Sequence, residues 1–231
     1  DWAGFDTGWH DIRLEADLET LRPAGWLDRT AICLADAVEV ADGTPVPVSP
    51  RSILRRQVDT LAEDGFTALA GTELEFYVYL GTPEDNRAAG HADLRPTTPQ
   101  SADYAIGPTD RWEPFFGDLR RRLADSGIEA EAHQGEWGLG QWEMTLRRQD
   151  PVTMADHHAL YKLAVRHVAA THGLTATFMA RPQTDQPGSS GHIHLSLWRG
   201  DEAAFADDTV LRAALAGAIE HTPDLLAWYA P

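Results

Sequence analysis

Two glutamates lie inside a strand-like segment, and this pattern limits the possible folds of the chain more than any other. Residues 66–80 are largely apolar and alternate in Glu73-Leu-Glu-Phe-Tyr-Val-Tyr, which predicts a β-strand. Residues two apart on a strand point to the same face, so Glu73 and Glu75 share one face. Like charges held there repel each other, and burial increases the cost unless a cation joins them. The alternative is an exposed strand face on which the pair has no special role.

Strand-like and helix-like patterns follow one another along the rest of the chain. Strands are predicted at residues 31–40, 128–133, 141–147, 174–180 and 191–198, and helices at 50–64, 110–126, 151–172 and 209–221, with a further short helical stretch from Pro223. Residues 81–108 are predicted to form a long polar loop. Strands separated by long helices indicate an α+β or α/β fold with one substantial sheet. The first 45 residues lack long helices and are expected to form a smaller N-terminal unit.

Composition excludes several classes of function. The 231 residues carry 19 basic and 36 acidic side chains, a net charge of −17, which argues against nucleic-acid binding and against an anionic membrane surface. Cys33 is the only cysteine, which rules out a disulfide framework and a multi-cysteine zinc site and fits a reducing cytoplasm. The sequence contains no membrane-span or signal-peptide pattern. It does not begin with methionine, so we expect a processed, trimmed or partial chain.

Three further groups of polar residues share a predicted strand or turn. Glu129, Glu131 and His133 alternate on one strand, Glu136 and Glu143 flank a glycine-containing turn, and His192, His194 and Ser196 alternate after a Gly/Ser loop. Each group alone has an ordinary alternative, namely a solvated strand face or a decorated hairpin. Together, five glutamates with a few imidazoles favour Mg²⁺ or Mn²⁺ over zinc. An oxygen-rich site for two such metals is typical of phosphoryl transfer.

These groups resemble the glutamine synthetase superfamily in their order and approximate spacing, over nearly the whole chain. The resemblance rests on Gly-x-Glu-x-Glu-Phe-Tyr at 71–77, Glu-Ala-His-x-x-Glu at 131–136, Gly-Gln-x-Glu at 140–143, Ala-Thr-Phe-Met-x-Arg-Pro at 176–182 and Gly-Ser-x-x-His-x-His-x-Ser at 188–196. It implies an α+β catalytic domain with an antiparallel-rich sheet and flanking helices at residues 46–231, with its C-terminal part absent. Residues 1–45 would be the end of a small N-terminal β-grasp-like domain.

The same resemblance implies an activity and roles for individual residues. The activity is ATP-dependent ligation of an amine to the γ-carboxylate of glutamate through a γ-glutamyl phosphate, in a cytoplasmic homo-oligomer built as a double ring. The metals would be Mg²⁺ or Mn²⁺ at two or more sites. The first metal's ligands match Glu75, Glu136 and Glu143, the second's match Glu73 and His192 plus a glutamate further along the chain, the nucleotide-lining positions match Glu131, His194 and Ser196, and the loop approaching glutamate matches Gly188. No catalytic residue is assigned.

Two departures from the family pattern leave alternatives open. Ammonia-using members read Asn-Gly-Ser-Gly-Met-His where this chain reads Pro187-Gly-Ser-Ser-Gly-His192, which is more similar to the branch that uses polyamines, ethanolamine or other organic amines. The chain also ends at Pro231, before the family's phosphate-binding arginines and last metal glutamate. A non-catalytic relative that binds nucleotide or glutamate, or an inactive fragment of a ligase, is therefore the alternative to an active ligase.

Overall fold

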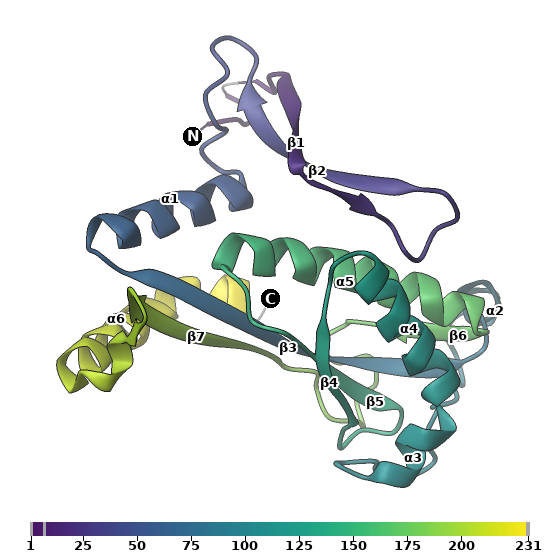
Figure 1. Ribbon diagram of the computed structural model, residues 1–231. Helices are drawn as coiled ribbons and strands as arrows, with labels where there is room; N and C mark the ends of the chain where they lie inside the picture. Colours follow the sequence, from purple (N-terminus) through teal and green to yellow (C-terminus); the bar gives the residue numbers. More distant parts are fainter. Residues whose placement is uncertain (1, 7, 230–231) are drawn as a thin grey trace.

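The computed structural model describes residues 2–6 and 8–229, and it divides into an N-terminal hairpin and a larger sheet covered by helices (Figure 1). The elements are β1 (Ile12–Pro23), β2 (Ala31–Glu39), α1 (Pro50–Glu63), β3 (Thr67–Leu80), α2 (Pro83–Ala88), α3 (Ile106–Arg111), α4 (Glu113–Asp125), β4 (Ala130–Gly135), β5 (Gln141–Leu146), α5 (Pro151–Thr171), β6 (Leu174–Thr177), β7 (Gly191–Arg199), β8 (Glu202–Ala203), a 3₁₀ turn η1 (Ala204–Ala206) and α6 (Asp208–Tyr229). None of the helices in these ranges is long and apolar enough to cross a bilayer.

The larger sheet has six strands, and every pairing in it is antiparallel. Its order is β4-β5-β3-β7-β8, with β6 also pairing with β3, so β3 is the central strand. Helices α4 and α5 lie across one face, above the sheet in Figure 1. This arrangement confirms the predicted α+β class with an antiparallel-rich sheet and flanking helices.

The hydrophobic core lies between that face and the two helices. Alternate residues of β3 and β5 point into it, and Phe76, Trp142 and Met144 are at most 1% exposed. From the helix side, Phe116 of α4 and Tyr161 of α5 are fully buried against them. Because side chains alternate along a strand, this packing directs the intervening glutamates to the opposite face of the sheet.

The N-terminal hairpin is held to the helices by a cluster of ion pairs. β1 and β2 form a separate two-stranded sheet. Arg51 of α1 donates to Asp17 of β1 (2.8 Å), Asp36 of β2 (2.7 Å) and Asp156 of α5 (3.0 Å). The Arg51 side chain is 15% exposed, so it is largely shielded from water while bonded to three carboxylates. The cluster therefore ties three elements that are distant in sequence to one cation.

Several predicted elements differ from the structure in extent. The strand predicted at residues 174–180 ends at Thr177, and the predicted loop at 81–108 contains α2, which a Thr82–Asp85 capping box starts. The second stretch predicted after Pro223 is not separate, because α6 continues through that proline to Tyr229. An interior proline lacks the N–H for one helical hydrogen bond and crowds the preceding turn, which is why the sequence predicted a break there. β1 was not among the predicted strands, although Ile12, Leu14, Ala16 and Leu18 alternate with charged residues.

Candidate metal centre and its surroundings

Strand register brings the acidic residues of three strands onto one face of the large sheet. Glu75 of β3 is directly opposite Glu143 of β5, and Glu73 is directly opposite His192 of β7. Directly paired residues project from the same face with Cβ atoms about 5 Å apart. The face opposite the helix-covered core therefore carries two carboxylate-containing pairs side by side.

Glu136 joins the first pair from the turn between β4 and β5. Donor oxygens of Glu75, Glu136 and Glu143 all lie within 4.8 Å of one another. The turn approaches β3 closely at Gly138, where an added Cβ would lie 2.1 Å from the hydroxyl oxygen of Tyr77. Only glycine fits at that position without a shift, and this close approach helps place Glu136 beside the sheet.

A second group shares a member with the first. Donor atoms of Glu73, Glu143 and His192 also lie within 4.8 Å of one another. The sequence pattern assigns Glu143 to one group only, whereas the structure places its carboxylate between both. The two groups therefore form one continuous cluster of four carboxylates and an imidazole, centred on Glu143.

Electrostatics within the cluster are unfavourable for the carboxylates alone. Burial, and then the neighbouring Glu73, Glu136 and Glu75 carboxylates, raise the pKa of Glu143 to about 8. Burial is also the main cause that raises the pKa of Glu136. A hydrogen bond from His194 (2.6 Å) is the largest of the causes that lower the pKa of Glu73. A divalent cation would offset these like charges, and carboxylate oxygens are the ligands that Mg²⁺ and Mn²⁺ prefer.

Two glutamine amides orient the carboxylates, and the sequence analysis assigned a role to neither, although Gln141 lies in the Gly-Gln-x-Glu motif. Gln134 of β4 donates through Nε2 to Glu143 (2.9 Å) and Glu136 (3.3 Å). Gln141 of β5 donates through Nε2 to Glu75 (2.6 Å). Glutamine carries no charge to mark it in a sequence. For Gln141, the sequence did offer a signal, because this polar residue lies two positions before Glu143 on a strand whose other residues are mostly apolar.

Glu131, His194 and Ser196 line one small cavity beside the cluster. The cavity has a volume of about 190 Å³ and is also bordered by Thr145 and Arg148. The strand register shifts between Ala130 and Ala132, so Glu131 occupies a bulge. This bulge makes one expectation wrong. His133 does not share the face of Glu131, because it pairs with buried Met144 and stacks on Phe116, with ring centroids 4.6 Å apart.

The Gly188 loop packs against the first group of carboxylates. The carbonyl of Gly188 accepts a hydrogen bond from Gln141 (3.1 Å), and the Ser190 N–H donates to Glu75 (3.1 Å). The Ser190 hydroxyl donates to the same carboxylate. At the start of the loop, the Pro187 carbonyl accepts a hydrogen bond from Tyr77 (2.7 Å). The loop therefore lies within hydrogen-bond distance of a candidate metal ligand.

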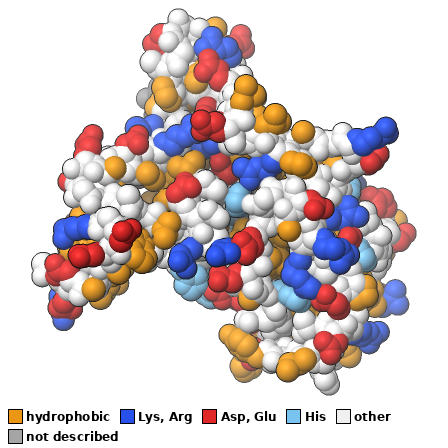
Figure 2. Space-filling view, viewed as in Figure 1, with side chains coloured by type: hydrophobic (Ala, Val, Ile, Leu, Met, Phe, Trp, Pro, Cys, Tyr) orange, Lys and Arg blue, Asp and Glu red, His pale blue; other side chains and the backbone are white. Residues whose placement is uncertain are grey.

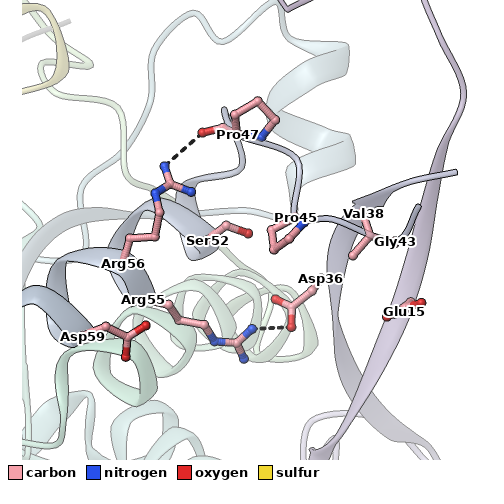
Figure 3. A pocket seen from close by; sticks show the side chains of 10 residues that line it. All are labelled: Glu15, Asp36, Val38, Gly43, Pro45, Pro47, Ser52, Arg55, Arg56 and Asp59. Carbon is pink, nitrogen blue, oxygen red and sulfur yellow. Dashed lines mark hydrogen bonds and ion pairs between the residues drawn. The ribbon is translucent and has the colours of Figure 1, made fainter. Parts of the chain in front are cut away.

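A larger cavity elsewhere is a weaker candidate for chemistry. It measures about 810 Å³ and lies between the hairpin and α1, away from all the predicted site residues (Figure 3). The charged side chains of this cavity are largely paired within the protein, since Arg55 binds Asp36 and Arg56 donates to the Pro47 carbonyl (3.2 Å).

Acidic and basic side chains are interspersed over the visible face of the molecule, which has no broad basic patch (Figure 2).

Comparisons with known protein families, sequences and solved structures all find similarity to the same family of proteins. Residues 47–231 match the glutamine synthetase catalytic domain. The chain is 38% identical to the gamma-glutamylethanolamide synthetase of Streptomyces coelicolor, over 99% of this chain and 50% of that protein. It is 34% identical to the glutamate–isopropylamine ligase of a Pseudomonas species, over 85% of this chain and 43% of that protein. The solved structure of GmaS without ligand has a TM-score of 0.76 at 27% identity, over 89% of this chain and 47% of that one. The chain thus spans about half the length of these relatives.

Proposed function

The chain belongs to the glutamine synthetase family, and on that basis we propose that it forms part of an ATP-dependent ligase that joins an amine to the γ-carboxylate of glutamate. The reaction proceeds through a γ-glutamyl phosphate. The observation that carries the proposal is the continuous cluster of four carboxylates and His192 on one sheet face, inside the region that matches the catalytic domain. The relatives named above are a synthetase and a ligase, so a non-catalytic relative is not favoured.

The cluster is proposed to hold two divalent cations, Mg²⁺ or Mn²⁺. Glu75, Glu136 and Glu143 would hold one, and Glu73 with His192 would contribute to the other. The donor set fits such ions, because burial and the neighbouring carboxylates raise the pKa of Glu143, and added positive charge would favour its ionised form. When bound, the cations supply charge that offsets the phosphate oxygens of ATP and the charge that develops on the transferred group.

The remaining site residues are proposed to hold the two other substrates. Glu131, His194 and Ser196 border one cavity, which supports a role in lining the nucleotide. Gly188 presents its backbone beside the carboxylates, as a loop that approaches glutamate would do. These residues bind and orient reactants and exclude water, which is most of what a protein contributes to phosphoryl transfer.

The amine is proposed to be organic, with ethanolamine or a polyamine preferred over ammonia. The support is the Pro187-Gly-Ser-Ser-Gly loop and the amine named in each of the two relatives above. We further propose that residues 1–45 are the end of an N-terminal β-grasp-like domain and that the catalytic domain begins near residue 46. The assembled protein is proposed to be a cytoplasmic homo-oligomer. The single half-buried Cys33 is compatible with a reducing compartment.

Phosphate release from ATP tests the proposal. The ligase of which this chain forms part is incubated with Mg²⁺, glutamate and, in turn, ammonium, ethanolamine, isopropylamine, putrescine or spermidine, and products are identified by mass spectrometry. We expect phosphate release that depends on one amine, together with its γ-glutamyl conjugate. Glu136→Gln should lose at least about 100-fold in rate, the scale of losing one electrostatic contact to the transition state. Glu129→Gln is the matched control, because Glu129 is an exposed carboxylate just before β4 and is paired with Arg147 (2.8 Å). Equal rates with and without every amine would overturn the proposal.

A further inference from the structure

The side-chain amide of Gln141 lies between the carboxylate cluster and the Gly188 loop. Gln141 is 1% exposed at the first position of β5. Its Nε2 group donates to Glu75 (2.6 Å) and to the Gly188 carbonyl (3.1 Å). Its Oε1 atom accepts from the Gly138 N–H (2.8 Å). One buried amide therefore contacts a candidate metal ligand, the Gly188 loop and the Glu136 turn.

These contacts fix the orientation of the amide. Both Nε2 hydrogens have an acceptor, and Oε1 has a backbone donor. Rotation of the amide by half a turn would place Oε1 against a carboxylate and a carbonyl, and Nε2 against an N–H. Each of those contacts is unfavourable in a buried site. The arrangement therefore holds only while Glu75 and Gly188 both stay in place.

The surroundings leave Gln141 little freedom to move. An added Cβ at Gly138 would lie 2.7 Å from Oε1 of Gln141, so the turn packs directly against the amide. The Tyr77 hydroxyl lies 3.4 Å from the same Oε1 atom and donates a hydrogen bond to the Pro187 carbonyl (2.7 Å). A displacement of the Gly188 loop is therefore transmitted to the Nε2 group that holds Glu75.

We propose that Gln141 is a positioning residue that makes divalent-cation binding and glutamate binding mutually favourable. This inference rests on the proposed function, which assigns Glu75 to the cation and the Gly188 loop to glutamate. Ordering Glu75 around a cation fixes the shared amide, and the fixed amide holds the Gly188 carbonyl in place for glutamate. Because coupling between two sites is reciprocal, glutamate tightens cation binding by the same factor.

The test compares the affinity for Mn²⁺ with and without saturating glutamate, followed by the electron paramagnetic resonance signal of free Mn²⁺. We expect glutamate to tighten Mn²⁺ binding roughly 5- to 150-fold in the unaltered protein, the usual range for coupled sites. In Gln141→Leu, an apolar side chain of similar size replaces the amide, and the hydrogen bonds to Glu75, Gly188 and Gly138 are lost, so this factor should fall close to one. Thermal unfolding of each variant verifies that it is folded.

Two further variants separate positioning from charge and from general packing. Gln141→Glu keeps the shape and the acceptor for Gly138 but removes both donors, so the coupling should vanish in it as well. A purely electrostatic role would instead give tighter Mn²⁺ binding with unchanged coupling. Gln186→Leu is the matched control, since Gln186 also joins the turn to the loop, through the Leu139 N–H (2.9 Å), without contacting a carboxylate. It should keep the wild-type factor.

The outcomes distinguish this inference from the function on which it rests. Absence of Mn²⁺ binding to the unaltered protein would overturn the proposed function and this inference with it. Mn²⁺ binding that glutamate leaves unchanged in the unaltered protein would overturn this inference alone. Coupling that persists in folded Gln141→Leu or Gln141→Glu would overturn the role of Gln141 alone. Loss of coupling in Gln186→Leu as well would also overturn it, by showing that any disturbance of the loop suffices.

Discussion

The pKa of Glu143 makes a quantitative prediction about cation binding. Burial and three neighbouring carboxylates raise this pKa to about 8. Below that pH the carboxyl holds a proton that a cation must displace. At pH 7, about one site in ten is unprotonated, so the affinity is about tenfold below its plateau. We therefore expect the Mn²⁺ dissociation constant to fall up to about tenfold per pH unit below 8, and to level off above it.

Calorimetry measures this directly. Mn²⁺ is titrated into the protein between about pH 6.5 and 8.5, in pairs of buffers that differ in ionisation enthalpy, so that released protons are counted. Close to one proton should leave per cation at pH 7, and about half of one at pH 8. Glu143→Gln should bind more weakly at high pH and lose this proton release. Glu129→Gln should behave as the unaltered protein does. A dissociation constant independent of pH over this range would refute the reasoning about like charges around Glu143.

Three further predictions concern stability. Arg51→Met leaves three aspartates without their shared cation and should cost about 3–5 kcal/mol of unfolding free energy in urea. A loss below about 1 kcal/mol would contradict this role of Arg51. The hydrogen bond from Arg51 is the main cause that lowers the pKa of Asp17. The stability that this ion pair contributes is therefore present above the ordinary aspartate pKa and is lost as the pH falls through the lowered pKa of Asp17. The difference in unfolding free energy between Arg51→Met and the unaltered protein should therefore shrink in acid. Gly138→Ala should cost about 1–3 kcal/mol because its Cβ meets the Tyr77 hydroxyl, and adding Tyr77→Phe should recover part of that loss, whereas additive losses would contradict the clash. Phe116→Ala empties a fully buried site and should cost about 3–5 kcal/mol by the same unfolding assay, with a loss below 1 kcal/mol as the contrary result.

Local periodicity predicted the parts of the site that lie on a single strand. Alternation placed Glu73 and Glu75 on one face, and the structure has both there because the intervening residues pack into the core. The glycine-containing turn between Glu136 and Glu143 was likewise visible in the sequence, and these two side chains do converge. The antiparallel-rich sheet was expected from the resemblance to a known family rather than from periodicity.

Features that depend on pairing between strands were not predictable from the residues. Glu75 lies opposite Glu143 because tertiary packing sets the register between β3 and β5. The residues of either strand alone do not predict that register. The bulge at Glu131 reverses the face of His133, and one extra residue in a strand leaves no trace in its alternation. The role of Gln141 was missed because it depends on Glu75 and the Gly188 carbonyl, which distant segments contribute.

Anomalous diffraction from crystals grown with Mn²⁺ tests the central claim most directly, because it locates each cation without reference to activity. The account predicts two anomalous peaks on the same face of the sheet, one contacting Glu75, Glu136 and Glu143 and the other contacting Glu73 and His192. Peaks located elsewhere on the protein, with these side chains bonded only to one another, would contradict it.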